Sequence, residues 1–288
     1  MRIPSFVSGA LAAGALMVSS LSAFAQTTAL PDLEIIGAPQ PGGMGFQPAA
    51  TELARDLQWL DGMVLFIITA ITAFVTVLLV IIAVRYNRRS NPKSATFTHN
   101  SPLEVAWTVV PILILVFIGS FSLPILFKQQ EIPAGDIVIK VTGHQWYWSY
   151  EYPEQEFSFD SYMLAREDLE ANGYSQQEYL LATDTAMVVP VNKTIVVQVT
   201  GADVIHAWAM PAFGVMQSGV PGRLSQLWFK AEKEGVYFGQ CTTLCGQAHA
   251  YMPITVKVVS EEAYAAWLEG AKAEYAGTAL PMDVALNN

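Results

Sequence analysis

Two long apolar segments constrain the fold of this chain more than any other feature. Residues 63–84 form a run of 22 residues without a charged side chain, and residues 105–127 form a run of 23. At about 1.5 Å of rise per helical residue, each run would reach about 33 Å, enough to cross the ~30 Å hydrocarbon core of a bilayer. The sequence therefore predicts a transmembrane hairpin of two helices.

The loop between the two segments sets the predicted orientation. It carries the basic residues Arg85, Arg88, Arg89 and Lys93. Because basic loops stay in the cytoplasm, both termini are expected in the periplasm of a bacterial inner membrane. Pro111 and Pro124 remove backbone donors inside the second segment, which neighbouring helices would have to cover. The hairpin is thus expected to anchor the chain, in contact with lipid and with a larger membrane protein.

The first 25 residues have the pattern of an export signal. Arg2 gives a positive start, an Ala/Leu/Val/Met run follows, and Ala23-Phe24-Ala25 offers a cleavage site between small residues. The mature chain would begin at Gln26. We therefore divide the chain into a signal peptide (1–25), an N-terminal segment with the hairpin (26–128) and a periplasmic domain (129–288).

The periplasmic domain is acidic and rich in short strand-like runs. It holds 19 Asp and Glu against 8 Lys and Arg, which makes a nucleic-acid partner unexpected. β-Branched and aromatic runs occur at 137–142, 145–152, 187–190, 194–199, 205–210, 224–229, 236–239 and 254–259. Gly, Pro and Asn separate them, a pattern typical of a sandwich or small barrel. A polar helical insertion over one edge of the sheet structure is predicted at 161–182, and a C-terminal helix after Ser260.

Five soft metal ligands stand out in this domain. They are His206, Cys241, Cys245, His249 and Met252, and the chain has no other cysteine. Thiolate and thioether donors with two imidazoles select copper over hard cations. One cysteine would suit a single copper, whereas a second cysteine lets two sulfurs bridge two metals. The set predicts a binuclear copper centre for electron transfer, at a rim where two loops meet.

Two other uses of the cysteines remain open from the residues alone. Cysteines four positions apart in a turn can form a disulfide in an oxidising compartment. Two Cys and two His can also hold a structural zinc. Neither alternative gives a role to Met252, which follows His249 by three positions.

Nearly the whole mature chain resembles subunit II of bacterial cytochrome c oxidase. The resemblance rests on the hairpin and on four motifs, listed here as they stand: Gly143-His144-Gln145-Trp146-Tyr147-Trp148, Asp203-Val204-Ile205-His206-Ala207-Trp208, Pro221-Gly222-Arg223, and the loop from Cys241 to Met252. It implies a cupredoxin-like barrel that carries the dinuclear copper centre CuA. The expected partners are cytochrome c as donor, subunit I with haems a and a3 and CuB, and subunit III.

The resemblance assigns the copper ligands residue by residue. Cys241 and Cys245 resemble the bridging thiolates, His206 and His249 the terminal imidazoles, and Met252 the axial thioether. The backbone carbonyl of Thr243 resembles the sixth ligand. The family normally has a glutamate at this position, whose carboxylate helps to hold a magnesium ion shared with subunit I. We therefore expect an intact copper site and a weakened or water-substituted magnesium site.

The same resemblance names residues for electron input and docking. Trp146 resembles the exposed indole through which electrons enter; the alternative is a core aromatic, and the match to the motif favours entry. Alternation along a strand would place Trp146 and Trp148 on one face, and the sequence does not say which face is exposed. Glu151, Asp160, Asp184 and Asp203 resemble the acidic set that docks a basic cytochrome c, although any one of them could be an ordinary solvated charge.

Glu104 has two compatible interpretations. Ser101-Pro102-Leu103-Glu104 reads as a capping box with proline at the first helical position. The family places a glutamate here, at the mouth of a proton pathway into subunit I. His99 and His144 match no ligand position and receive no role.

Three other classes of protein share parts of this pattern. Quinol oxidase subunit II has the hairpin and barrel but lacks the copper ligands. The electron-accepting domain of nitrous oxide reductase has the copper loop but not the two-span anchor. A membrane-tethered copper carrier or assembly factor could use Cys-x-x-x-Cys with histidines to pass copper on. The aromatic run around Trp146 and the acidic surface favour electron transfer.

Overall fold

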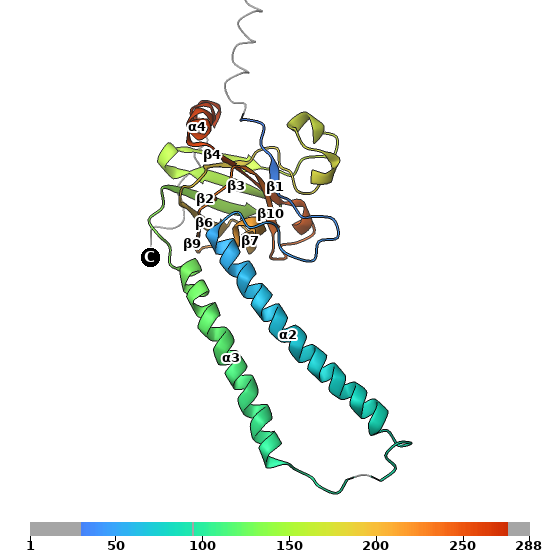
Figure 1. Ribbon diagram of the computed structural model, residues 1–288. Coiled ribbons are helices and arrows are strands. Elements are labelled where there is room, and N and C mark those ends of the chain that lie inside the picture. The colour runs from blue at the N-terminus through green and yellow to red at the C-terminus, as the bar shows by residue number, and fades with distance from the viewer. Residues whose placement is uncertain (1–29, 94, 276–288) are drawn as a thin grey trace, which may run out of the picture.

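A computed structural model describes residues 30–93 and 95–275 of the chain. The expected export signal lies outside these residues. Two long helices, α2 (Glu52–Arg85) and α3 (Ser101–Gln130), leave one end of a β domain and diverge toward the loop that joins them (Figure 1). Both are long and apolar enough to span a membrane. No residue of α3 is buried in the chain, so its apolar side chains face outward along the whole hairpin.

The starts of the two helices show different capping. The N-cap of α2 is Thr51, whose side chain accepts a hydrogen bond from the N–H of Ala54. At α3 the expected cap at Ser101 is wrong by one position. Asn100 is the N-cap, its side chain accepts from the N–H of Leu103, and Glu104 accepts from the N–H of Asn100. Asn is as good a cap as Ser, and its position places Pro102 second in the helix.

The β domain consists of two sheets. The first has the order β5-β11-β10-β7-β8, with β1 added beside β10, and the second has the order β4-β3-β2-β6-β9. The first sheet contains β1 (Ile35–Gly37), β5 (Met187–Pro190), β7 (His206–Met210), β8 (Val215–Gly219), β10 (Gly235–Cys241) and β11 (Pro253–Val259). The second contains β2 (Ile137–His144), β3 (Tyr147–Tyr152), β4 (Phe157–Ser161), β6 (Ile195–Gly201) and β9 (Ser225–Phe229).

The expected eight strands are all present, and the sequence missed three. These are β1, β4 and β8, of which β1 is only three residues long and β8 contains Gln217, Ser218 and Gly219. One predicted strand also starts too early, because residues 145 and 146 form the turn between β2 and β3. Trp146 therefore lies outside the strand alternation that linked it to Trp148.

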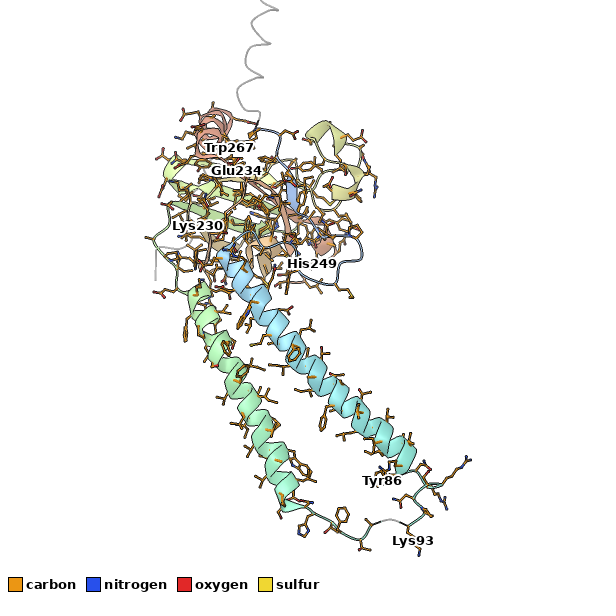
Figure 2. All side chains as sticks on the ribbon, viewed as in Figure 1. Tyr86, Lys93, Lys230, Glu234, His249 and Trp267 are labelled. Carbon is orange, nitrogen blue, oxygen red and sulfur yellow. The ribbon has the colours of Figure 1, made fainter. Side chains whose placement is uncertain are left out.

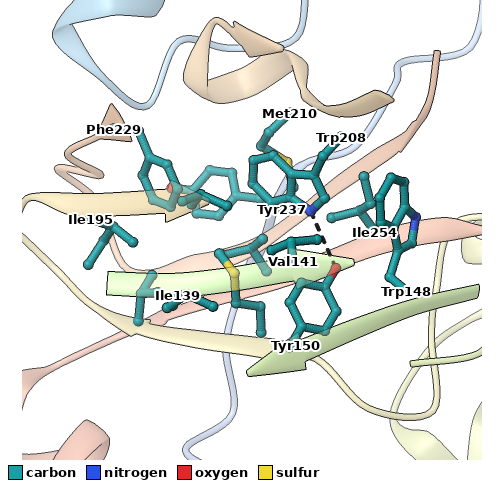
Figure 3. Packing of buried hydrophobic residues seen from close by; sticks show 14 of the residues in the cluster. Ile139, Val141, Trp148, Tyr150, Ile195, Trp208, Met210, Phe229, Tyr237 and Ile254 are labelled. Carbon is teal, nitrogen blue, oxygen red and sulfur yellow. Dashed lines mark hydrogen bonds between the residues drawn. The ribbon is translucent and has the colours of Figure 1, made fainter. Parts of the chain in front are cut away.

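The core lies between the two sheets and is rich in aromatic rings. Trp148 and Tyr150 come from the second sheet, and Trp208 and Tyr237 from the first; all four are fully buried. Figure 3 shows the Trp208 indole reaching the Tyr150 hydroxyl across the core. The indole N–H donates to this hydroxyl, and the nitrogen and oxygen atoms are 3.4 Å apart. Large buried rings with satisfied polar atoms give this core a fixed packing.

The insertion at 161–182 covers a face of the first sheet, not one of its edges. It contains only turns and two short 3-10 helices, Glu170–Asn172 and Gln176–Glu178, in place of a longer helix. Its Leu169 and Tyr174 pack with Val236 and Phe238 in a second, smaller apolar cluster. The predicted C-terminal helix is confirmed as α4 (Glu261–Tyr275), and the Ser260 hydroxyl caps it by accepting from Ala263 N–H.

Hydrogen bonds and ion pairs join the hairpin to the β domain. The Thr51 hydroxyl donates to the carbonyl of Phe213 at 2.7 Å. Lys128 of α3 pairs with Glu52 and Asp56 of α2 at 2.6 Å each. The Trp228 indole of β9 donates to the carbonyl of Lys128 at 3.2 Å. The upper ends of both helices are therefore tied to one another and to the domain.

Candidate metal centre

The candidate ligands meet at one rim of the β domain. His206 is the first residue of β7 and Cys241 the last of β10, and these strands pair through Cys241 and Trp208. After β10 the chain loops through a short 3-10 helix, His249–Tyr251, and re-enters the sheet as β11. Figure 2 places His249 at the end of the domain from which the helices leave, and Trp267 at the opposite end.

The ligand atoms are close enough to share a small metal centre. Those of His206, Cys241 and Cys245 lie within 4.8 Å of one another, and all three residues are buried. The Cys245 sulfur lies 3.6 Å from Nδ1 of His249 and 3.5 Å from the sulfur of Met252. The carbonyl oxygen of Thr243 lies 3.3 Å from the Cys241 sulfur. The structure thus brings together all the ligands that the sequence predicts, and both cysteines are free thiols.

The orientation of His206 fits a metal ligand. Its Nε2 lies 2.8 Å from a carboxylate oxygen of Asp203, which can only accept, so Nε2 carries the proton. Nδ1 is then a bare acceptor, and it is buried without any hydrogen-bond partner. An unpaired buried nitrogen aimed at two thiols is costly unless a cation binds it. A carboxylate behind a ligating histidine is also the usual outer support of a metal site.

Glycine at position 143 makes room for this histidine. A Cβ atom there would lie 2.7 Å from Cγ of His206, closer than side-chain carbons approach in proteins. The ring therefore packs directly on the backbone of β2. The sequence motif around Gly143 and the motif around His206 meet at this contact.

The two thiols differ in their affinity for protons. Burial alone would raise the pKa of Cys241, but the adjacent His206 ring and nearby backbone groups lower it to about 7. Burial, followed by the negative charge of Cys241, raises the pKa of Cys245 to about 12. The thiols of Cys241 and Cys245 together therefore keep a proton at neutral pH. A metal that binds both as thiolates must displace this proton.

Two side chains from the β2–β3 region fasten the ligand loop. Nε2 of Gln145 donates to the carbonyl of Cys245 at 2.8 Å, and the Trp148 indole donates to the carbonyl of Met252 at 3.1 Å. The backbone N–H of Gln145 also donates to Asp203 at 2.7 Å. Gln145 thus contacts both the support of His206 and the loop that carries the thiols.

Trp146 lies against the ligand loop and is half-buried. A Cβ atom at Gly246 would lie 2.9 Å from Cζ2 of the Trp146 ring, so the indole edge rests on the loop backbone. Trp148, in contrast, is fully buried in the core. The structure therefore places Trp146, and not Trp148, between the surface and the candidate metal centre.

Three of the four candidate docking acids gather around a stack of rings beside Trp146. The rings of His144 and Tyr147 stack at 4.5 Å between centroids, and Tyr147 stacks on Tyr162 at 4.6 Å. Asp160 accepts from the hydroxyl of Tyr162, and Asp184 accepts from its backbone N–H. The negative charges of Asp160 and Asp203 both act on His144, whose pKa burial nevertheless lowers.

Glu151 and Glu104 lie apart from this group. Glu151 pairs with Lys140 at 3.0 Å, and its side chain is only 15% exposed. Its charge is therefore largely neutralised by a neighbour in the next strand. Glu104 lies in the first turn of α3, at the far end of the hairpin, where it contacts the backbone of Asn100.

Sequence reasoning missed three contributions to the site. Gln145 and Gly143 were quoted in a motif but received no role, and Asp203 was assigned to docking alone. The signal for Asp203 was available, since it precedes His206 by three positions and could reach it across a turn. The contact between Gln145 and Cys245 joins residues 100 positions apart, which no local pattern reveals.

Known proteins resemble both parts of the chain. The family model described as the cytochrome c oxidase subunit II transmembrane domain matches residues 39–125, and that of its periplasmic domain matches residues 137–259. Cytochrome c oxidase subunit 2 of Cereibacter sphaeroides is 59% identical over 94% of this chain and 93% of its own length. A probable subunit 2 of Rickettsia bellii is 43% identical over 80% of this chain and 84% of its own.

A solved structure is similar to about half of the chain. The crystal structure of the periplasmic domain of cytochrome oxidase subunit II from Bradyrhizobium japonicum is 53% identical to this chain. The match covers 50% of this chain and 99% of that one, with a TM-score of 0.46.

Proposed function

Because the chain belongs to the cytochrome c oxidase subunit II family, we propose that it receives electrons from cytochrome c at a CuA centre and passes them to haem a of subunit I. The observation that carries this proposal is the convergence of soft ligands at one rim, with Nδ1 of His206 buried and unpaired among them. Such a donor set selects copper, and its two thiols suit two metals.

Each ligand has a defined part in holding the centre. Cys241 and Cys245 would supply two thiolates, His206 and His249 two imidazoles, and Met252 and the Thr243 carbonyl the remaining donors that hold the copper. When bound, the copper pair shares one electron over both metals, so each transfer requires little rearrangement. The chain contributes rigidity, because Gln145 and Trp148 fasten the loop and Asp203 fixes the ring of His206.

The surface beside Trp146 is the proposed docking site for a basic cytochrome c. Asp160, Asp184 and Asp203 surround the stacked rings, so an acidic rim encloses a partly apolar centre. Opposite charges raise the rate of association and lose their effect in salt. We assign Glu151 the smallest share, because Lys140 already pairs with it.

The membrane and proton-related roles follow from the hairpin. We propose that the chain lies in the bacterial inner membrane, with both termini and the β domain in the periplasm and subunits I and III beside the helices. Glu104 would mark the start of a proton pathway into subunit I. Its Gln variant keeps the contact with Asn100 but removes the charge, so unchanged turnover would leave only the capping role.

The chain departs from the family at the magnesium site, because Thr243 stands where the family normally has a glutamate. Its carbonyl lies beside the Cys241 sulfur, whereas its hydroxyl cannot replace a carboxylate as a charged ligand for magnesium. We propose that magnesium binds weakly in the assembled oxidase. A Thr243→Glu variant should increase the magnesium content without changing the copper spectrum, and full, tightly held magnesium in the unmodified enzyme would contradict the proposal.

Copper quantitation with electron paramagnetic resonance on the purified oxidase tests the centre directly. We expect three coppers per oxidase, two in this chain and CuB in subunit I, and a mixed-valence spectrum. A single colourless Cu(I) would instead support the copper carrier. Trp146→Gln should then slow oxidation of cytochrome c while leaving that spectrum unchanged, and Trp107→Gln in α3 is the matched control.

A further inference from the structure

A cavity of about 680 Å³ lies on the outer face of the first sheet, away from the metal centre. The segment 30–35, the insertion, β11 and α4 form its walls. Trp267, one of its lining residues, lies at the end of the domain opposite to the helices (Figure 2). A cavity of this size matches the sites that hold small organic molecules in proteins. Its position leaves it facing away from the proposed membrane.

Two polar groups in the cavity wall have no hydrogen-bond or ion-pair partner among the described residues, although the Lys257 ammonium makes a cation–π contact with the Tyr174 ring. Tyr174 is only 7% exposed, and its hydroxyl is buried without a hydrogen bond. Lys257 is half-buried on β11, and none of the described residues forms an ion pair or hydrogen bond with its ammonium group. The Lys257 nitrogen lies 5.8 Å from the centre of the Tyr174 ring. Burying a hydroxyl and a cation without partners costs free energy that a bound acceptor would recover.

The side chains that surround Lys257 in its own sheet offer no partner for its positive charge. Burial alone lowers its pKa, with no contribution from a nearby carboxylate. Val236 and Val188 flank it on the neighbouring strands, so its own sheet offers no acceptor side chain there. The chain nevertheless keeps a cation at the floor of a cavity.

The remaining walls restrict the kind of ligand. Leu33, Trp267 and Tyr275 supply apolar and aromatic surface. Asp32, Asp184 and Glu274 also line the cavity and outnumber its single cation. Their negative charges repel any anion, and a dianion such as phosphate more strongly than a monocarboxylate, whose single charge Lys257 can balance.

We propose that this cavity binds a small molecule that carries one carboxylate on an apolar body. The carboxylate accepts hydrogen bonds from the ammonium of Lys257 and the hydroxyl of Tyr174, the two unpartnered donors. The apolar body lies against Trp267 and Leu33. This site is separate from the proposed copper centre and does not depend on it.

Binding of 4-fluorophenylacetate to the full chain in lipid nanodiscs, followed by fluorine NMR, tests the site. Empty nanodiscs give the lipid background, and 4-fluorophenylacetamide is the uncharged control probe. We expect saturable binding of the acid and at least about ten-fold weaker binding of the amide, because the amide has no negative charge to pair with the Lys257 ammonium. Equal binding of the two probes, or displacement of the acid by an equal concentration of inorganic phosphate, would overturn the proposal.

Variants assign the binding to the two donors. Lys257→Met should weaken binding of the acid about ten-fold or more, and Tyr174→Phe should weaken it a few-fold. Lys230→Met, the same change at an exposed position, should leave it unaltered. Lys257→Met removes a buried unpaired charge, so it should fold and melt no lower than the parent.

Two results would contradict this assignment. One is unchanged binding in a folded Lys257→Met variant. The other is binding that appears only when residues 276–288 are removed. The C-terminal carboxylate of the full-length chain would then be the group that occupies the cavity.

Discussion

The metal rim and the membrane hairpin use apolar side chains in opposite ways. At the rim, Trp148, Trp208 and Met252 are buried, and the loop is fastened by hydrogen bonds from other parts of the chain. Along the hairpin only Leu53 and Ala54 are buried, both in the first turn of α2. The rim is therefore specified by the chain itself, whereas the hairpin depends on lipid and neighbouring subunits. Changes at the rim should have large effects, and those near the hairpin should have small ones.

Removal of copper should have the largest effect on the rim. A metal that binds only the folded state contributes its binding free energy to stability, so the copper-free chain should melt at least about 10 °C lower. The fold should persist, because the contacts of Gln145 and Trp148 with the loop do not require metal. Differential scanning calorimetry with and without a copper chelator measures this shift. Identical melting curves would show that copper does not stabilise the rim.

Asp203→Asn should be the most damaging substitution that leaves every ligand in place. Nε2 of His206 would lose its charged acceptor, and loss of such a support typically costs about 10–100-fold in metal affinity. Competition with a copper chelator gives the affinity. Asp160→Asn is the control, since it should weaken cytochrome c binding in low salt but not copper binding. Similar copper affinities in both variants would limit Asp203 to docking.

Gln145→Ala should have an intermediate effect. It removes the hydrogen bond to the Cys245 carbonyl, worth about 1 kcal/mol, and loosens the turn that holds Trp146 against Gly246. Oxidation of cytochrome c should slow a few-fold at full copper content. Gln177→Ala, in the insertion, is the control. Copper loss parallel to the loss of rate would instead place Gln145 in metal binding.

Thr51→Ala should cost about 1–2 kcal/mol, because it removes the cap of α2 and the bond to the Phe213 carbonyl. Thermal unfolding of the purified chain measures the loss. Thr76→Ala, in the middle of the same helix, should be close to neutral. An equal loss from both variants would mean that the upper end of α2 is no better anchored than the rest of the hairpin.

The ion pair between Arg55 and Glu232 should have the smallest effect. The hydrogen bond from Arg55 lowers the pKa of Glu232 below its ordinary value of 4.5. A lowered pKa in the folded state means that the stabilisation is present above pH 4.5 and is lost as the pH falls below it. Since both side chains are partly exposed, the loss should stay below about 1 kcal/mol. Glu232→Gln should remove this part of the acid dependence, as measured by melting at pH 3–7.

The sequence predicted the features that depend on local pattern. The two spans follow from charge-free runs, and the ligands from the chemistry of Cys, His and Met. It failed where contacts join distant segments. Gln145 reaches Cys245 across 100 positions and Asp203 across 58, and no spacing rule connects them. It also failed at the start of α3. Asn100 and Ser101 are both suitable N-cap residues, and only the backbone conformation distinguishes them.

The contacts of Lys128 with α2 and β9 affect the rate of electron transfer. Lys128 of α3 pairs with Glu52 and Asp56 of α2, and its carbonyl accepts from the Trp228 indole, so these contacts restrict movement of the β domain relative to the helices. Tunnelling rates fall exponentially with separation, and a swinging domain would spread them over orders of magnitude. A fixed joint instead keeps every molecule at one distance from an acceptor in the membrane. The few polar contacts at the top of the hairpin thus help to hold the distance for electron tunnelling constant.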